Sequence, residues 1–463
     1  MTTALKQTLR DSKAARWTAL IIVSFTVMWG YFLTDAMSPL MDTLRISIEQ
    51  GGMGWTAKDF GDFNWAYMWF NVIFFALLFG GIILDKIGVR LTGIASCLLM
   101  IIGACIKYYS VEYIQPGGDI FFIGLNKQVF IASLGFAIFA VGTENCGITV
   151  TKVIARWFRG YETALAMGIQ VAVARLGTAL ALIGSNPLAK RFDVSTPLLL
   201  ALVLLVIGLM AYLVFCVMDS RLDKQEGTFV DENAEDETFK LADLTIILKN
   251  KGFWIIALLC CCFYSAVFPF LKYATSLMIN KYGVDPDWAG AFPTLIPLGN
   301  LVMTPFFGAI YGKYGKGATI MIIGSVLLII VHLLFALPLL NDALFASFIM
   351  LLLGVAFSLV PSAMWPSVPK IIPLHLLGSA YALIFWVQNI GLGFVPKLIG
   401  HILEKYCIVG KVMRDGNEVI QYDYTIPMLI FAVFGVIALT LAIWLKYEDG
   451  KKGYGLERPN ITK

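Results

Sequence analysis

The chain has 463 residues, of which 59% are hydrophobic and only 14% charged, and it carries a formal net charge of +4. Soluble domains average roughly 25% charged and about 45–50% apolar residues, so this composition excludes an ordinary soluble protein. The net charge is small and no block of basic residues is present, which excludes a nucleic-acid-binding surface. The eight cysteines lie mostly in apolar runs and include no CxxC pair, so neither a zinc site nor a disulfide framework is predicted.

Apolar stretches long enough to cross a bilayer follow one another along the whole chain. A spanning helix takes about 20 mostly apolar residues. We expect twelve spans, at residues 17–41, 62–84, 90–111, 128–152, 162–186, 197–218, 252–280, 289–312, 317–339, 342–367, 378–401 and 425–446. The first apolar run is too long for a signal peptide and lacks a small-residue cleavage site, so it is expected to remain as the first transmembrane helix. The predicted fold class is an all-α membrane protein.

The longest polar interruption, residues 219–251, divides the spans six and six. We expect an N-terminal six-helix bundle over 1–218, a cytoplasmic linker over 219–251 with a short surface helix near 239–249, and a C-terminal six-helix bundle with a cytoplasmic tail over 252–463. Lys and Arg are more frequent in the segments on the side of the two termini than in the opposite loops, to which Arg45 and Lys107 are assigned. Both termini are therefore predicted to be cytoplasmic.

A short pattern, G-x-x-x-(D/G)-K-x-G, recurs at equivalent places in the two halves. The first copy begins at Gly81, after the second span, and the other begins at Gly308, after the eighth. Duplicated halves with a solute site between them are a common plan of transporters. We therefore expect two pseudo-symmetric bundles.

The first copy resembles the loop motif of the major facilitator superfamily. The matching residues are Gly81, Asp85, Lys86, Gly88 and Arg90. Glycines permit a tight turn between helices, and Asp85 is expected to bond the end of a neighbouring helix and so latch the outward-open state. The second copy has Gly312 in place of the acid, which predicts a weaker latch. The resemblance covers essentially the whole chain and implies the major facilitator fold.

Two longer stretches, Ala155 to Gly177 and Met364 to Gly391, resemble the subgroup whose animal members are lysosomal exporters of dipeptides. In that subgroup an acid on the fourth helix and an arginine on the fifth hold the two ends of a dipeptide, and an aromatic residue on the tenth lines the site. The residues at the matching positions are Glu144, Arg175 and Trp365.

This chain departs from the subgroup in its targeting signals. Residues 1–16 contain no acidic dileucine signal, and the only N-x-S/T sequon, 460–462, falls in the predicted cytoplasmic tail. We therefore expect a bacterial inner membrane protein without a glycosylated accessory subunit.

Charged residues inside the spans lead to the same site without the resemblance. They are Asp35, Glu144, Arg175, Lys272 and Lys397. Each costs about 2.5–3.5 kcal/mol if it faces lipid, so a polar cavity or mutual pairing is expected. A carboxylate suits the ammonium group of a dipeptide, and an arginine suits its carboxylate. Glu144 and Arg175 either form this clamp, or pair with each other to hold the bundle together, or do both in turn.

The other intramembrane charges leave alternatives open. Lys272 is expected either to contact a substrate carboxylate or a backbone carbonyl, or to pair with an acid such as Asp35 across the halves. Asp35 either binds an amine, forms an outer gate with Lys272, or carries a proton. Lys397 is expected to extend to the membrane surface, and His332 to be a packed histidine. Further residues expected to line the site are Tyr31, Tyr273, Asn300 and Asn389.

The predicted function is alternating-access transport of dipeptides, with proton coupling left open. The alternative is a transporter of organic anions, because Arg175, Lys272 and Lys397 outnumber Asp35 and Glu144 in the spans. No nucleophile–histidine pair, metal-spaced ligand set or cofactor motif is present in the sequence, so no enzyme activity, metal or cofactor is expected. The expected partners are a small-molecule substrate and the lipid bilayer, and the expected state is a monomer.

Overall fold

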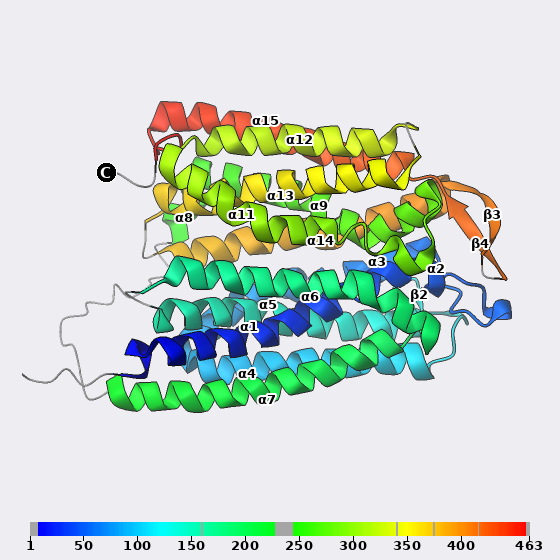
Figure 1. The fold of residues 1–463 in the computed structure, drawn as a ribbon, viewed down its shortest axis with the longest axis horizontal. Helices are drawn as coiled ribbons and strands as arrows, with labels where there is room; N and C mark the ends of the chain where they lie inside the picture. The colour runs from blue at the N-terminus through cyan, green and yellow to red at the C-terminus, as the bar shows by residue number, and fades with distance from the viewer. Residues whose placement is uncertain are drawn as a thin grey trace, which may run out of the picture.

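The computed structural model describes residues 8–158, 161–226, 244–338, 341–373, 376–414 and 416–459. Its long helices run nearly parallel, with the segments 8–226 and 244–459 forming two halves side by side (Figure 1). These described residues include 11 helices long and apolar enough to cross a membrane, or 12 if one bent pair forms a single span. The prediction of an all-α membrane protein with twelve spans is thereby confirmed, apart from two short hairpins outside the helices.

The N-terminal half contains the long helices α1 (Lys13–Asp35), α4 (Ala76–Tyr113), α5 (Lys127–Trp157), α6 (Thr163–Arg191) and α7 (Thr196–Glu226), and the shorter α3 (Ala57–Trp65). Its shorter elements are η1 (Leu9–Asp11), η2 (Ser38–Leu40), α2 (Met41–Leu44), η3 (Ile48–Gln50), the π-helix η4 (Trp69–Ile73), and the hairpin of β1 (Ile120–Phe122) and β2 (Leu125–Asn126).

The C-terminal half contains α9 (Lys251–Tyr282), α11 (Leu295–Tyr314), α12 (Gly317–Ala336), α13 (Ala343–Ile371), α14 (Leu377–Tyr406) and α15 (Thr425–Lys452). Its shorter elements are α8 (Leu244–Lys249), α10 (Pro286–Ala289), and the antiparallel hairpin of β3 (Ile408–Arg414) and β4 (Asn417–Tyr422). Residues 227–243 of the predicted linker and the sequon at 460–462 lie outside the described residues. Helix α7 continues to Glu226 and α9 begins at Lys251, so both helices extend into the stretch assigned to the linker.

Side-chain caps fix where several of the helices begin. Ser12, Asn126, Asn250 and Asp342 each accept a hydrogen bond from a backbone N–H in the first turn of the helix that follows. These N–H groups have no partner within the helix, and burying them unpaired is unfavourable. The caps therefore set helix starts that hydropathy alone places only within a few residues.

The second span is not the continuous helix expected over 62–84. It is divided into α3, the π-helix η4 and the first turns of α4, and the two parts are bent by 53°. Phe75 lies at the break in the left-handed region, with φ 56° and ψ 22°. A π-helix and a left-handed residue interrupt the regular hydrogen-bond ladder, which is the physical reason for the bend. Apolar composition continues across the break, so hydropathy does not reveal it.

Exposed apolar side chains cover the outside of the bundle. On α7 they include Val203, Val206, Ile207, Met210, Val214 and Val217. Inside each half, glycines bring helices close together: a Cβ on Gly103 of α4 would lie 2.4 Å from the Phe139 backbone nitrogen of α5. An apolar exterior with small residues at helix contacts is typical of proteins packed within lipid. The chain is a multi-pass integral membrane protein.

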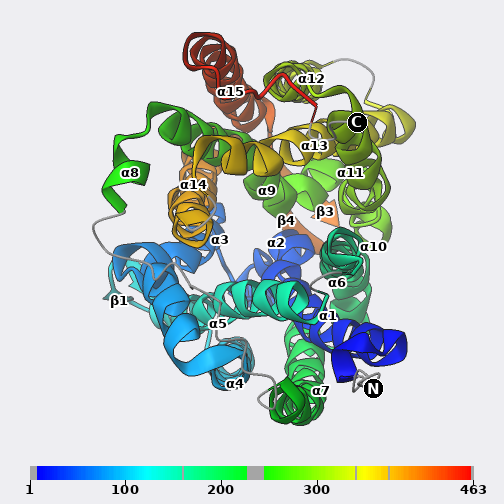
Figure 2. The same cartoon turned by 90° about the vertical axis from the view of Figure 1, so that its left-hand side faces the viewer.

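The two halves meet closely at the end of the molecule that carries β3 and β4, which we call the hairpin end. The opposite end, where α1 begins and α15 ends, is called the terminal end (Figures 1 and 2). At the hairpin end, a Cβ on Gly61 of α3 would lie 2.7 Å from the Pro396 carbonyl oxygen of α14. The Ala57 N–H of α3 donates to the Glu404 carboxylate of α14, and Arg45 donates to the Ile420 carbonyl of β4. The structure is therefore closed at the hairpin end.

Candidate functional site

Glu144 lies near the middle of α5, 17 residues from Lys127 and 13 from Trp157, or about 26 and 20 Å from the helix ends. Its carboxylate accepts a hydrogen bond of 2.8 Å from the Tyr67 hydroxyl. Asn389 of α14, in the other half, hydrogen-bonds the same carboxylate. Glu144 therefore faces the interface between the halves and is held there by two neutral groups. Its side chain is only half-buried, although it lies deep in the protein.

Arg175 lies at a comparable depth, 12 residues from the start of α6 and 16 from its end, or about 18 and 24 Å. The guanidinium faces the rings of Tyr31, Phe268 and Phe357, with its carbon 5.3, 4.8 and 5.6 Å from their centres. Two of these rings come from the C-terminal half. Within the described part of the chain no hydrogen bond or ion pair is found for Arg175, and the distance between Glu144 and Arg175 exceeds that of an ion pair. Tyr31 lies within electrostatic reach of both residues.

Aromatic side chains of the C-terminal half gather around Trp365 of α13. Its indole N–H donates to the Tyr264 hydroxyl over 3.1 Å, and its ring lies 5.1 Å from Phe385 and 5.7 Å from Tyr381. Tyr264 also packs edge-on against Phe357, one of the rings that face Arg175. Trp365 is thus linked through aromatic contacts to the surroundings of Arg175 and is only half-buried.

Asp35 and Lys272 form an ion pair across the halves at 2.6 Å. Lys272 also donates to the Thr34 carbonyl over 2.7 Å, and Thr178 donates to the second oxygen of Asp35 over 2.8 Å. In this conformation Asp35 and Lys272 close the hairpin end, which corresponds to the pairing that the sequence left as one alternative for Lys272. Their polar groups are engaged with each other and with the protein.

Tyr273 and Asn300, which the sequence analysis also expects to line the site, are both buried. Tyr273 is fully buried, donates to the Pro396 carbonyl over 2.7 Å and packs edge-on against Phe60 of the other half. Tyr273 belongs to the closed contact between the two halves at the hairpin end, which we call the seam. A large ring so close to the α3–α14 contact is enclosed on all sides. Asn300 is buried in α11 and accepts a hydrogen bond from Thr304, one turn further along.

Lys397 also crosses the seam. Its ammonium lies 3.2 Å from Asp62 and 3.5 Å from the centre of the Trp65 ring, both in the N-terminal half. The Lys397 side chain remains 40% exposed, and the pairing with the buried Asp62 was not predicted from the sequence. His332 is fully buried between Phe270 and Phe431, with Nε2 2.9 Å from the Ala266 carbonyl, as expected of a packed histidine.

The superfamily-like loop motif joins three helices of the N-terminal half at the terminal end. Gly88 has φ 80° and ψ 171°, a conformation open only to glycine. Arg90 binds Asp223 of α7 at 2.6 Å and lies 3.7 Å from Asp219, while Arg156 of α5 contacts both acids. The Asp85 side chain lies outside the described residues. Lys86 is exposed, and a side chain added at Gly81 would meet open space.

The repeat in the C-terminal half keeps the backbone but changes the contacts. Gly315, which corresponds to Gly88, also has a positive φ of 71°. The chain after α15 packs against this loop: Glu457 accepts from the Thr319 N–H and hydroxyl, and Leu456 is fully buried. The two loops are therefore alike in their turn and different in what holds them.

Several residues of this arrangement were not predicted from the sequence. Tyr67, Phe268 and Phe357 are ordinary members of an aromatic-rich chain, so no local signal marks them. Asp62 and Lys107 carried a signal, since both are charged residues within predicted spans. Lys107, counted among the outside loops, lies inside α4 and is fully buried.

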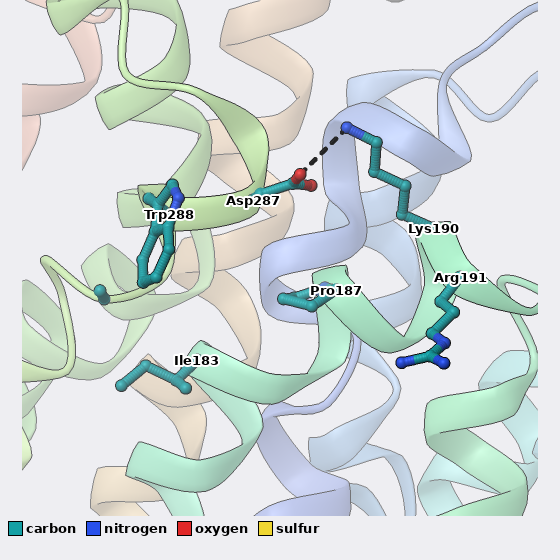
Figure 3. Close-up of a pocket in the computed structure, with 7 residues that line it drawn as sticks. Ile183, Pro187, Lys190, Arg191, Asp287 and Trp288 are labelled. Atoms are coloured by element: carbon teal, nitrogen blue, oxygen red, sulfur yellow. Dashed lines mark hydrogen bonds and ion pairs between the residues drawn. The ribbon is translucent and has the colours of Figure 1, made fainter.

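A surface groove of about 470 Å³ lies at the hairpin end (Figure 3), and neither Glu144 nor Arg175 lines it. It runs between the end of α6 and α10, and an ion pair of 3.1 Å between Lys190 and Asp287 crosses it. The groove therefore belongs to the seam between the halves.

Three comparisons place the fold and the family. The family model described as Major Facilitator Superfamily matches residues 20–396. The lysosomal dipeptide transporter MFSD1 of Bos taurus is 26% identical over 409 residues, covering 84% of this chain and 80% of the relative. Among solved structures, a variant of the nucleoside transporter NupG superposes with a TM-score of 0.67 at 15% identity, covering 93% of this chain and 99% of that one. A variant of the peptide transporter POT superposes with a TM-score of 0.65 at 14% identity, with coverage of 94% and 95%.

The structural similarities at this level of identity establish the fold alone, whereas the family model covers most of the chain. The two pseudo-symmetric halves, the loop motif and the repeated turn at Gly88 and Gly315 agree with it. This protein belongs to the Major Facilitator Superfamily and is a transporter that resembles the subgroup of the lysosomal dipeptide transporters.

Proposed function

We propose that the protein transports dipeptides by alternating access, with Glu144 holding the amine of the substrate and Arg175 its carboxylate. The observation that carries the proposal is the state of Arg175. This cation lies in the middle of a span, faces three aromatic rings, and has no hydrogen-bond or ion-pair partner among the described residues. A charge so placed is costly unless a ligand or water compensates it.

The two charges are held apart in a way that suits a zwitterion. Tyr67 and Asn389 fix the Glu144 carboxylate without neutralising it, so its negative charge remains available to an ammonium group. The planar guanidinium of Arg175 binds a carboxylate through two parallel hydrogen bonds. The backbone of a dipeptide extends at most about 7 Å, so one molecule can contact two groups on neighbouring helices. The curated relatives are named as dipeptide transporters, which supports the same substrate class.

The organic-anion alternative rested on an excess of cations in the spans, and the pairing of the lysines weakens it. Lys272 is paired with Asp35, and Lys397 is paired with Asp62. Of the five charged residues that the sequence places within the spans, only Arg175 and Glu144 then remain without an ion pair in the described part of the chain. A site with one charge of each sign favours a zwitterion over an anion.

The conformation suggests how the site is reached. Because the hairpin end is closed, a solute would approach from the terminal end, and opening the hairpin end would require the pairs Asp35–Lys272 and Asp62–Lys397 to separate. We further propose that the terminal end faces the cytoplasm, in keeping with the distribution of Lys and Arg. The same proposal places the protein in a bacterial inner membrane, as a monomer without an accessory subunit.

The test is thermal stabilisation of the purified protein by a panel of small molecules. The panel contains free dipeptides, their N-acetylated and C-amidated forms, single amino acids and dicarboxylates. A ligand supplied at 100 times its Kd stabilises the folded state by about 2.7 kcal/mol, so weak binding is still detected. Each compound is also tested on the variants Glu144→Gln and Arg175→Ala. The matched controls, Glu49→Gln and Arg191→Ala, make the same substitutions at exposed residues.

The proposal requires that free dipeptides stabilise the protein and that N-acetylation or C-amidation of the dipeptide abolishes the effect. Either site substitution should also abolish it, while both control variants retain it. Stabilisation by dicarboxylates alone, unaffected by Glu144→Gln, would overturn the proposal in favour of an anion transporter.

A further inference from the structure

Lys107 is a buried cation that the proposed transport mechanism does not use. It lies on α4, six residues before the helix ends at Tyr113, and its side chain has no exposed surface. Its ammonium lies 5.0 Å from the centre of the Phe63 ring and 4.6 Å from that of Phe136. No acid lies within ion-pair distance of it in the part of the chain that the structure describes. A lysine in such a place is costly and therefore calls for a physical explanation.

The polar contact that Lys107 makes is with the end of α1. Its Nζ donates to the Leu33 carbonyl over 3.2 Å. Helix α1 ends at Asp35, and a turn and the short helix η2, which contains Pro39, follow. The last carbonyls of a helix lack partners within it and form the negative end of its dipole. Lys107 thus places a positive charge at that negative end.

Lys272 places a second positive charge at the same end of α1. It donates to the Thr34 carbonyl, next to the one that Lys107 contacts, and it pairs with Asp35. Lys107 lies within electrostatic reach of both Asp35 and Lys272. One helix end is therefore held by two lysines at adjacent carbonyls, one from each half of the protein.

The two lysines differ in what happens when the hairpin end opens. Lys272 belongs to α9 of the C-terminal half, so its bonds cross the seam and must break as the halves separate. Lys107 and the two rings around it belong to the N-terminal half together with α1. Lys107 therefore stays with α1 in both conformations.

We infer that Lys107 is a positioning residue for the transport cycle: it holds the end of α1, with Asp35, in the state in which Lys272 has moved away. It acts through α1 and contacts no substrate. The inference rests on alternating access, the common mechanism of the family, and it does not depend on the solute being a dipeptide.

The inference predicts opposite effects for the two lysines. Without Lys107, the open state has no lysine at the end of α1, whereas the closed state keeps Lys272 and loses the repulsion between two neighbouring ammonium groups. Lys107→Met should therefore shift the population toward closure of the hairpin end. Lys272→Met removes a contact found only in the closed state, so it should shift the population toward opening. We expect shifts of about tenfold in opposite directions.

The experiment measures distances between spin labels attached at Glu49 and Met413, two exposed positions on opposite sides of the seam at the hairpin end. The labels are placed in a background with the exposed Cys105 replaced by serine. The protein is reconstituted without solute, so the result is independent of the substrate proposal. Lys127→Met, which removes an exposed lysine of the same half, is the matched control and should leave the distances unchanged.

Two further variants separate charge from packing. Lys107→Arg keeps the charge and should retain the distribution of the unmodified protein, and Lys107→Gln keeps an N–H donor without charge and should behave like Lys107→Met. If Lys107→Met does not fold, Lys107→Gln carries the test. An unchanged distribution in the uncharged variants, or a shift in the same direction as Lys272→Met, overturns the inference.

Discussion

Tyr67 donates its hydroxyl to the Glu144 carboxylate over 2.8 Å, although 77 positions separate the two residues in the sequence. Tyr67 lies between α3 and η4, where the second span is broken. The position of the carboxylate thus depends on an irregular stretch of backbone. This relationship is the first to test, because Tyr67 contacts the proposed site without carrying charge.

Replacing Tyr67 by phenylalanine removes this hydrogen bond and keeps the ring. A hydrogen bond to a charged group contributes about 1.5–3 kcal/mol, and 1.4 kcal/mol corresponds to a tenfold change in affinity. We expect Tyr67→Phe to weaken dipeptide binding by about tenfold or more, because Glu144 is then free to turn from the amine. Binding is measured by titration of the purified protein. Tyr109→Phe, at an exposed ring, is the control, and equal affinities for the two variants would contradict the prediction.

The glycines of the loop motif should differ in their tolerance of a side chain. Gly88 has φ 80° and ψ 171°, where a side chain costs about 1–3 kcal/mol, whereas Gly81 is helical with open space around it. We expect Gly88→Ala to lower the unfolding midpoint clearly and Gly81→Ala to leave it nearly unchanged. Thermal unfolding of both variants in the same detergent measures the difference. Equal decreases in the unfolding midpoint would contradict the prediction, because the motif would then need its glycines for helix contacts and not for the turn.

The two acids on α7 that meet Arg90 and Arg156 should contribute unequally to stability. The Asp219 side chain is 1% exposed and also accepts a hydrogen bond of 3.0 Å from Trp157, whereas Asp223 is 36% exposed. Breaking a buried ion pair costs about 3–5 kcal/mol, and an exposed one at most about 1 kcal/mol. Asp219→Asn should therefore destabilise the protein strongly and Asp223→Asn weakly. Unfolding in a denaturing detergent titration measures both, and the reverse order would refute the prediction.

Two lysines share the Asp62 carboxylate, and only one of them crosses the seam. Lys397 comes from α14 of the C-terminal half, and Lys58 from the preceding turn of α3 itself. Lys397→Met should favour opening of the hairpin end, by about threefold for a pair that is partly exposed. Lys58→Met should leave the equilibrium unchanged, because its bond exists in either state. The labels at Glu49 and Met413 report both effects, and a shift caused by Lys58→Met alone would show that the carboxylate does not link the halves.

The number of spans and their division into two halves could be predicted from the sequence, because these properties are local. A run of about 20 apolar residues forms a helix wherever a bilayer surrounds it. The same physics placed Glu144 and Arg175 near the middle of their helices, since depth follows from counting residues along a span. The break in the second span was missed for the same reason, because apolar composition continues through η4 and Phe75.

Partners across the molecule were decided by the tertiary structure alone. Asp35 and Lys272 are 237 positions apart, and the sequence left their pairing as one of several alternatives. The packing of the helices also determines three further contacts. Tyr67 donates to Glu144, Arg175 faces three rings without a hydrogen-bond or ion-pair partner among the described residues, and Lys107 is buried against α1. The sequence determined which charges enter the membrane, since hydropathy is summed along the chain. Only the packing of helices distant in sequence decided which charges neutralise each other and which have no ion pair among the described residues.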